Sequence, residues 1–271
     1  MIQAKHHSAS RWLSNLVFGA LNDCLGHLAG KTAGSRLIFD FFGRILPIPR
    51  IVVRGIPIKV IMPLNQIGVF NTAKTWESRE PEVLDWIDGF DRDCTFFDVG
   101  ASFGTETLYA ALKPNGPHKI VAFDLSLQSS FNLAYNISLN NITNVTQYYL
   151  ALSDSIKLIP YSEPTQYYSV NNRPKYDNIS YRTISVSMDY FIKMIDLFPD
   201  YIKIDVDGSE LSIISGMKKT LQDPRLQSLV IEVSDASEPG VVALLTNAGF
   251  KIAGARKSAD EDTKNIIFTR T

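Results

Sequence analysis

The fold is decided by residues 96–104, which read Phe96-Phe97-Asp98-Val99-Gly100-Ala101-Ser102-Phe103-Gly104. An apolar run ends in an acid, turns at Gly100 and enters a helix at Gly104. In a doubly wound sheet, an adenosine-containing cofactor binds at this first turn from strand to helix. Glycine at 100 allows a ligand to approach the backbone, and glycine at 104 allows the helix to pack closely on the strand. The motif therefore predicts a cofactor site in an α/β fold.

Apolar runs and helical patterns alternate along the rest of the chain. The runs are Thr95–Val99, Lys119–Phe123, Val145–Leu152, Tyr201–Val206 and Leu229–Val233, with helical segments near 104–112, 129–140, 209–221 and 237–248. Such alternation is typical of a parallel sheet covered on both faces. The final runs, Phe250–Ala255 and Asn265–Arg270, are too close for a parallel crossover and predict an antiparallel hairpin. We therefore predict an open Rossmann-like sheet, mostly parallel, with one antiparallel strand.

Residues 1–90 are expected to form an N-terminal helix and β-hairpin extension, and residues 91–271 the Rossmann-like domain. Within the extension, residues 50–63 are β-branched and predict a hairpin around Gly55-Ile56-Pro57. Tyr, Asn and Pro interrupt the alternation of strands and helices at about 155–185. That interruption predicts a hairpin insertion in the domain.

The composition excludes several classes of protein. The chain has 271 residues, of which 45% are hydrophobic, so it is not a disordered chain and can bury a large core. Lys and Arg number 27 and Asp and Glu number 28, and this balance gives no reason to expect nucleic acid as a partner. The 2 cysteines and 4 histidines form neither a disulfide framework nor a metal-ligand pattern. We therefore assign no metal site.

Residues 11–28 carry one apolar stripe at helical spacing, within a basic N-terminal part of the chain. We favour a helix that packs on its own protein over one that docks on a membrane surface. The sequence has no apolar stretch long enough to span a bilayer and no signal-peptide pattern. We expect a cytoplasmic protein, with peripheral membrane contact through residues 11–28 as the alternative.

Asp124 ends the second apolar run, about twenty residues after Gly104. An acid at this spacing accepts hydrogen bonds from the ribose hydroxyls of a cofactor. A dinucleotide site would need glycine where Ser102 stands, and Asp98 would repel a pyrophosphate. Asp98 suits the ammonium group of S-adenosylmethionine, so this methyl donor fits better. A strand–turn–helix unit that binds no ligand is the structural alternative.

A second group of charged residues follows the fourth run, in Lys203-Ile204-Asp205-Val206-Asp207-Gly208-Ser209-Glu210. Ligands bind beyond the carboxyl ends of parallel strands, and alternation places Lys203, Asp205 and Asp207 on one side. Asp205 is the first candidate for holding or deprotonating an acceptor, with Lys203 adjusting its charge. Asp207 serves equally well as a helix cap. A divalent cation on the two acids is a less favoured alternative.

Several motifs, in order, resemble the FkbM family of methyltransferases over roughly residues 70–235. They are Asp98-Val-Gly-Ala-Ser-Phe-Gly104, Asn140-Asn141 with Asn144-Val145, Ala151-Leu152-Ser153, Met188-Asp189 and Ile202-Lys-Ile-Asp-Val-Asp-Gly-Ser-Glu210. The resemblance implies a class I methyltransferase fold with S-adenosylmethionine as cofactor. It also implies that the methyl group goes to a hydroxyl oxygen of a small molecule or sugar.

The resemblance also assigns individual residues. Taken together with the spacing arguments above, it gives the candidate donor-binding residues Asp98, Gly100, Ala101, Ser102, Phe103, Gly104, Asp124, Leu125, Ala151, Leu152 and Glu77, and the candidate catalytic residues Asp205, Lys203 and Asp207. The chain departs from the family pattern at Ser102, where Asn is common, and at Asp124-Leu125, where Glu-Pro is common. It also has Asp207 where Glu is usual. Asp124 keeps the carboxylate that ribose binding requires.

Two other classes of function stay open beside an O-methyltransferase. A non-catalytic binding module can keep the same fold, because fold does not dictate function. An NAD-dependent oxidoreductase also uses a Rossmann-like sheet, although the first motif fits a dinucleotide less well. Binding of S-adenosylmethionine or its demethylated product would distinguish a methyltransferase from an NAD-dependent oxidoreductase.

Overall fold

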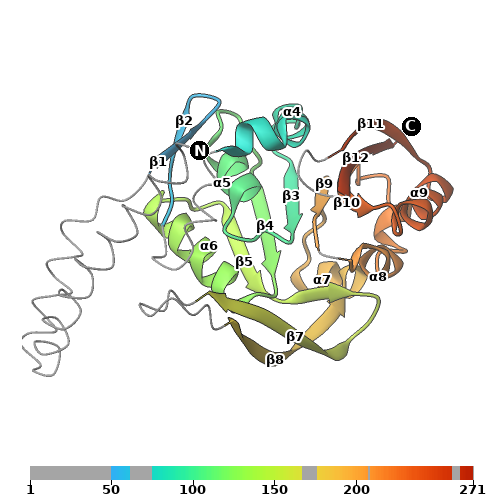
Figure 1. Cartoon of the computed structure of the whole chain (residues 1–271). Helices are drawn as coiled ribbons and strands as arrows, with labels where there is room; N and C mark the ends of the chain where they lie inside the picture. Colours follow the sequence, from blue (N-terminus) through green and yellow to red (C-terminus); the bar gives the residue numbers. More distant parts are fainter. Residues whose placement is uncertain (1–49, 62–74, 167–175, 207, 258–262, 271) are drawn as a thin grey trace, which may run out of the picture. The chain divides into compact units, whose positions relative to one another are not determined.

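The computed structural model describes residues 50–61, 75–166, 176–206, 208–257 and 263–270 (Figure 1). The predicted helix at 11–28 and the predicted site residue Asp207 lie outside the described residues. Contacts between Cα atoms divide the chain into two compact units. One consists of Met1–Ile48 and Pro164–Asn178, and the other of Pro49–Glu163 and Ile179–Thr271. The second unit contains the large sheet and its helices.

A seven-stranded sheet forms the centre of this unit. Its strands are β3 (Thr95–Val99), β4 (Lys119–Asp124), β5 (Val145–Tyr149), β9 (Tyr201–Ile204), β10 (Ser228–Ser234), β11 (Phe250–Lys257) and β12 (Thr263–Arg270). Across the sheet they follow the order β11-β12-β10-β9-β3-β4-β5 (Figure 1). Neighbours are parallel except β12, which is antiparallel to both β10 and β11. The predicted open, mostly parallel sheet with one antiparallel strand is therefore confirmed.

Helices cover both faces of the sheet, because successive residues of a buried strand point to opposite sides. The helices are α4 (Pro81–Asp88), α5 (Thr105–Leu112), α6 (Leu127–Leu139), α7 (Met188–Ile195), α8 (Glu210–Ser215) and α9 (Glu238–Asn247). Phe97 belongs to the core cluster on the side of α7, α8 and α9. Its neighbour Phe96 belongs to the opposite cluster, with residues of α4 and α5. Both phenylalanines are 0% exposed, so β3 lies at the centre of the core.

A β-hairpin of β1 (Arg50–Val53) and β2 (Ile56–Lys59) precedes α4. Its turn residues, Arg54 and Gly55, have φ values of 48° and 80°. Two consecutive positive φ values are typical of a type I′ turn, whose twist matches that of a hairpin. The turn therefore lies one residue before the predicted position, because Arg54 takes the first left-handed site and residue 57 is already in β2.

The predicted run Val145–Leu152 is divided between two sheets. β5 ends at Tyr149, and β6 (Ala151–Ser153) begins a three-stranded sheet in the order β6-β8-β7. In it, β6 pairs in parallel with β8 (Tyr176–Ser187), and β8 also neighbours β7 (Lys157–Gln166). The chain thus leaves the large sheet at Leu150, beside the carboxyl end of β4, where Leu150 N–H donates to Asp124 O at 3.2 Å.

The helix predicted near 209–221 is shorter than expected. α8 ends at Ser215, and a separate 3₁₀ turn covers Thr220–Gln222. A Cβ atom at Gly216 would lie 2.1 Å from the carbonyl oxygen of Ser153. The chain therefore passes against β6 at a point where only glycine fits, and this contact is invisible to helical periodicity.

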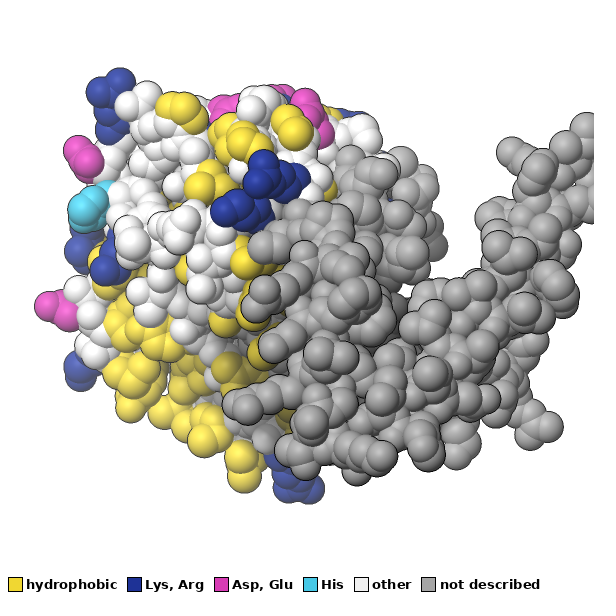
Figure 2. All heavy atoms as spheres, turned by 90° about the vertical axis from the view of Figure 1, so that its left-hand side faces the viewer, with side chains coloured by type: hydrophobic (Ala, Val, Ile, Leu, Met, Phe, Trp, Pro, Cys, Tyr) yellow, Lys and Arg dark blue, Asp and Glu magenta, His cyan; other side chains and the backbone are white. Residues whose placement is uncertain are grey.

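α6 carries apolar side chains on its outer face as well as its inner one. Leu133 is 0% exposed, whereas Leu127, Phe131 and Tyr135, spaced four residues apart, are 47%, 65% and 50% exposed. Figure 2 shows the side of the molecule where α6 lies, and hydrophobic side chains gather in the lower part of this view. In the described part of the chain, no helix combines the length and apolarity needed to cross a membrane.

Candidate active site

A cavity of about 500 Å³ lies at the carboxyl ends of β3, β4, β9 and β10. One wall is apolar and includes Phe123, Leu125, Leu150, Leu152 and Ile213. The cavity is also lined by four carboxylates, which belong to Glu80, Asp124, Asp205 and Glu232. This is the edge at which open α/β sheets bind ligands, so the cavity is the candidate active site.

The glycine-containing turn after β3 fits tightly between its neighbours. Gly100 has a φ of 85°, and a Cβ there would lie 1.8 Å from the carbonyl oxygen of Asp205. The N–H groups of Gly100 and Ala101 both donate to Phe123 O at 2.9 Å. Gly104 has a φ of 98°, and its missing Cβ would lie 2.4 Å from Leu133 Cδ1. Both glycines are therefore required, one at the cavity and one for the packing of α5 beside α6.

Asp124 connects two loops of the cavity wall. Its Oδ2 accepts a hydrogen bond from Ser102 N–H and its Oδ1 accepts one from Ser126 N–H, each at 2.7 Å. Ser102 has a φ of 49°, so its backbone is bent to present this amide. Asp124 thus lies where β4 ends, fixed by backbone donors, with its side chain on the cavity wall.

Lys203 lies among acids behind that wall. It is 2% exposed, and its Nζ is 2.5 Å from Asp205 Oδ2 and 3.8 Å from Glu106 Oε1. Burial alone would lower its pKa, but the charges of Asp205, Glu106 and Asp98 raise the pKa of Lys203 well above its ordinary value. Burial alone would raise the pKa of Asp205, but the Lys203 ammonium lowers it. The pair is therefore ionised, with Asp205 facing the cavity.

Asp98 is completely buried rather than exposed to the cavity. It is 0% exposed, and its Oδ2 accepts a hydrogen bond from Thr107 Oγ1 at 2.5 Å. Its Oδ1 has no hydrogen-bond partner. Burial raises the pKa of Asp98 to about 7, although Lys203 opposes the shift. The structure thus places this acid beneath the turn, where it contributes to the charge balance around Lys203.

The predicted site residues fall into three groups. Those that line the cavity are Gly100, Ser102, Asp124, Leu125, Ala151, Leu152 and Asp205. Those that lie in its supporting layer are Asp98, Ala101, Phe103, Gly104 and Lys203. Glu77 belongs to neither group, because it is exposed and its Oε2 accepts a hydrogen bond from Arg54 N–H at 3.0 Å.

Two acids of the cavity were not expected from the sequence. Glu80 precedes α4, and burial raises its pKa to about 8. Glu232 lies in β10, and burial together with the charge of Asp205 raises its pKa to about 7. The only signal for Glu232 in the sequence was its position as a single acid in the apolar run Leu229–Val233. Among the described residues, no group of three or more His, Cys, Asp or Glu is arranged to hold a metal ion.

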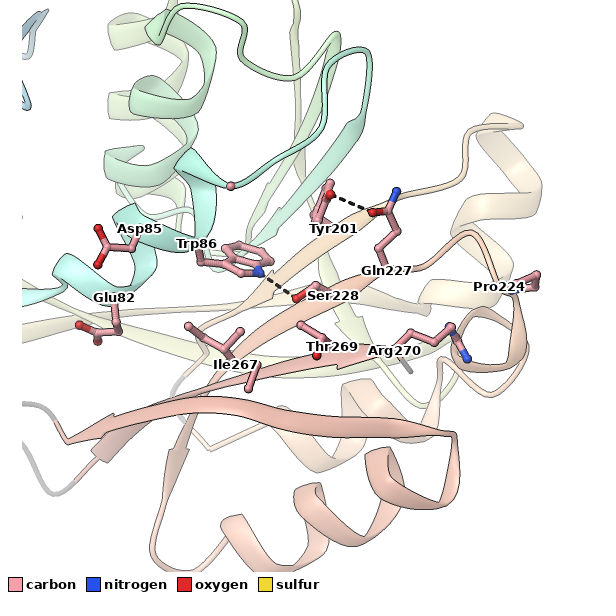
Figure 3. A pocket seen from close by; sticks show the side chains of 12 residues that line it. Glu82, Asp85, Trp86, Tyr201, Pro224, Gln227, Ser228, Ile267, Thr269 and Arg270 are labelled. Carbon is pink, nitrogen blue, oxygen red and sulfur yellow. Dashed lines mark hydrogen bonds between the residues drawn. The ribbon is translucent and has the colours of Figure 1, made fainter.

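A larger hollow, of about 810 Å³, lies at the opposite edge of the sheet, near the amino ends of β9 and β10 (Figure 3). Its polar side chains contact one another. Trp86 Nε1 donates to Ser228 Oγ at 2.8 Å, and the Tyr201 hydroxyl donates to Gln227 Oε1 at 2.9 Å (Figure 3). Since ligands of such sheets bind at the carboxyl ends of the strands, size alone does not make this hollow the active site.

The smaller cavity suits a cationic adenosine derivative. Its apolar wall offers a surface for a flat ring, and Asp124 lies where a ribose diol is bound in this fold. Gly100 lines the cavity next to Asp205, so the backbone of the first turn forms part of its wall. The ionised Asp205 gives the cavity negative charge beside the Gly100 turn. The residues present therefore fit S-adenosylmethionine.

Comparisons with known proteins give a family and similar structures. The Methyltransferase FkbM domain matches residues 98–252, more than half of the chain. An FkbM methyltransferase from Methylobacillus flagellatus KT is 16% identical over 77% of this chain and 56% of that one, with a TM-score of 0.48. No curated protein matches the chain.

Two further solved structures are similar. A ribosomal protein L11 methylase from Lactobacillus delbrueckii subsp. bulgaricus is 14% identical over 72% of this chain and 79% of that one, with a TM-score of 0.47. TrmK from M. capricolum, solved with S-adenosyl-homocysteine, is 11% identical over 70% and 68%, with a TM-score of 0.46. With the domain match and the sheet order described above, the chain belongs to the FkbM family of methyltransferases, which have a Rossmann-like class I fold and use S-adenosylmethionine.

Proposed function

We propose that this protein transfers a methyl group from S-adenosylmethionine to a hydroxyl oxygen of a small molecule or sugar. The observation that supports it best is an ionised carboxylate, Asp205, held by Lys203 at 2.5 Å and facing the cavity beside the Gly100 turn. A hydroxyl acceptor needs such a hydrogen-bond acceptor, because its proton must leave as the new bond forms. The cofactor supplies an electrophilic methyl group on a sulfonium centre.

The residues of the cavity divide the work between donor and acceptor. We assign donor binding to Gly100, Ser102, Asp124, Leu125, Ala151 and Leu152, which line the cavity. Asp205 binds and orients the acceptor hydroxyl, and Lys203 keeps Asp205 ionised from the buried side. Asp207, which is outside the described residues, is assigned to the acceptor side by its place in the sequence. This division would hold the two reactants at adjacent walls, and such positioning lowers the barrier to group transfer.

The test combines donor binding and turnover. Calorimetry should detect binding of S-adenosylhomocysteine, and methyl-labelled S-adenosylmethionine should label a hydroxyl compound from a panel of sugars and phenols. The variant Asp205→Asn should keep the affinity for S-adenosylhomocysteine but lower turnover roughly 10²–10⁴-fold. Asp154→Asn, a change of an acid whose pair with Lys157 lies on the surface, is the matched control and should leave both unchanged.

Three results would contradict the proposal. Thermal stabilisation by NAD without any effect of S-adenosylhomocysteine would indicate an oxidoreductase. Binding of S-adenosylhomocysteine without transfer to any hydroxyl compound would indicate a binding module or another acceptor atom. Full turnover of the Asp205→Asn variant would remove Asp205 from the acceptor side.

A further inference from the structure

Asp205 and Glu232 both line the cavity, close enough for each carboxyl group to shift the pKa of the other. Two carboxylates cannot hydrogen-bond to each other, because neither has a proton to donate. Two such groups side by side also resist ionising together, so one member of the pair keeps a proton over a range of pH, as in other sites where two acids share a pocket. The proposed function uses only one member of this pair.

The sheet brings the two acids together. β9 and β10 are parallel neighbours, and their last registered pair is Ile204 with Ile231. The residue that follows Ile204 is Asp205, and the residue that follows Ile231 is Glu232. Both carboxyl groups therefore lie at the same edge of the sheet. Glu232 Oε1 also accepts a hydrogen bond from Thr263 Oγ1 of β12 at 3.0 Å. Glu232 is therefore held from both sides, by Asp205 and by Thr263.

Lys203 decides which acid carries the proton. Its ammonium is 2.5 Å from Asp205 Oδ2, and such a contact stabilises the charged form of Asp205. Among the described residues, no cation lies within ion-pair distance of Glu232, whose charged neighbours are Asp205, the more distant Lys203 and the acid Glu80. The proton of the pair therefore resides on Glu232, whose pKa is raised to about 7 by burial and by the charge of Asp205.

We propose that Glu232 is the general base of the reaction, and that Asp205 holds the acceptor hydroxyl for it. This inference rests on the proposed function. The unprotonated Glu232 takes the hydroxyl proton while the oxygen lone pair forms the new O–C bond. The C–S bond breaks, and its electron pair remains on sulfur. Glu232 then releases the proton to water, which restores the starting state.

Glu80, the other acid of the wall with a raised pKa, is less suited to this step. Its Oε2 is buried and has no hydrogen-bond partner, so that oxygen does not reach a substrate in the cavity. The charge of Glu232 nevertheless raises the pKa of Glu80, so the two acids titrate under each other's influence. A test of the base must therefore separate the titration of Glu232 from that of its neighbours.

The experiment is a pH profile of kcat and kcat/KM with the methyl acceptor found for the wild-type enzyme. For the wild type, both should rise with pH to a plateau above about 7, because the base acts in its unprotonated form. Glu232→Gln should lower kcat roughly 10²–10⁴-fold and remove this rise, while its affinity for S-adenosylhomocysteine stays at the wild-type value. Glu238→Gln, a change of an acid that pairs with Lys264 outside the cavity lining, should keep the wild-type profile.

A second variant keeps the proposal testable if Glu232→Gln does not fold. The hydrogen bond from Thr263 lowers the pKa of Glu232, so Thr263→Val, which removes the donor but keeps the shape, should move the midpoint of the profile to higher pH. A wild-type rate and profile in Glu232→Gln would overturn the inference, as would loss of donor binding or an unmoved midpoint in Thr263→Val. In each of these cases the wild type still methylates a hydroxyl, so the proposed function stands. A wild type that methylates no hydroxyl contradicts both.

Discussion

The side chains of Asp98 and Lys203 lie next to each other on parallel strands, in register at the centre of the sheet. Asp98 is 0% exposed and Lys203 is 2% exposed. Lys203 crosses the buried layer to reach Asp205 Oδ2 at 2.5 Å. A cation is thus held among several acids inside the core, and the cavity receives its negative charge from an acid that this cation keeps ionised.

Loss of the Lys203 charge should destabilise the fold strongly. In Lys203→Met the buried acids lose their counter-ion, and breaking a buried ion pair from one side costs about 3–5 kcal/mol. Urea unfolding of the variant measures the loss. Lys264→Met is the matched control, because its partner Glu238 is partly exposed and such a pair contributes less than about 1 kcal/mol. Equal losses in the two variants would show that the buried acids do not depend on Lys203.

Gly100→Ala should lower the free energy of unfolding by more than the positive φ of residue 100 alone explains. A positive φ in a non-glycine residue costs about 1–2 kcal/mol, and here a Cβ would also meet the carbonyl oxygen of Asp205 at 1.8 Å. Gly55→Ala provides the control, since Gly55 has a φ of 80° and nothing lies within 4 Å of its added Cβ. We expect the first variant to be less stable than the second and to lose binding of S-adenosylhomocysteine. Equal stability, or retained binding, would contradict the tight turn.

The sequence was sufficient where spacing along the chain determines position in space. Asp124 ends β4 and reaches the turn at Ser102 because the first strand–helix–strand unit has a fixed geometry. The antiparallel β12 follows from the short connection after β11. These features depend on local pattern and on the connection between neighbours.

The rest depends on contacts between distant parts of the chain. The end of α8 at Ser215 is set by Gly216 against Ser153, 63 residues earlier in the sequence. Glu232 joins the site only because β10 lies beside β9, and an acid in an apolar run does not reveal which face or end of the sheet it occupies. Glu77 and Glu80 are three residues apart, yet only Glu80 lines the cavity.

Removal of the Asp124 carboxylate should weaken donor binding. Asp124→Ala loses an ionised acceptor for the ribose hydroxyls and frees the amides of Ser102 and Ser126, which it now binds. We expect affinity for S-adenosylhomocysteine, measured by calorimetry, to fall by about 1–3 kcal/mol. Asp154→Ala, a change of a surface acid, should leave it unchanged. Wild-type affinity in Asp124→Ala would show that another residue holds the ribose.

The last prediction concerns the pH dependence of stability. Burial raises the pKa of Glu80 from its ordinary 4.5 to about 8, so between these values the folded protein keeps a proton that the unfolded chain releases. The free energy of unfolding must therefore fall as pH rises through this window, by up to about 1.4 kcal/mol per pH unit for one group. Asp98 and Glu232, with pKa values raised to about 7, add to the fall up to that pH.

Glu80→Gln has no carboxyl group to titrate at this position, so the loss of stability between pH 6 and pH 8 should shrink by about 1–3 kcal/mol, reduced by the partial exposure of the site. Glu77→Gln, a change of an exposed acid three residues earlier, should retain the wild-type slope in urea unfolding. A slope that Glu80→Gln leaves unaltered would mean that Glu80 is already ionised in the folded protein at pH 6.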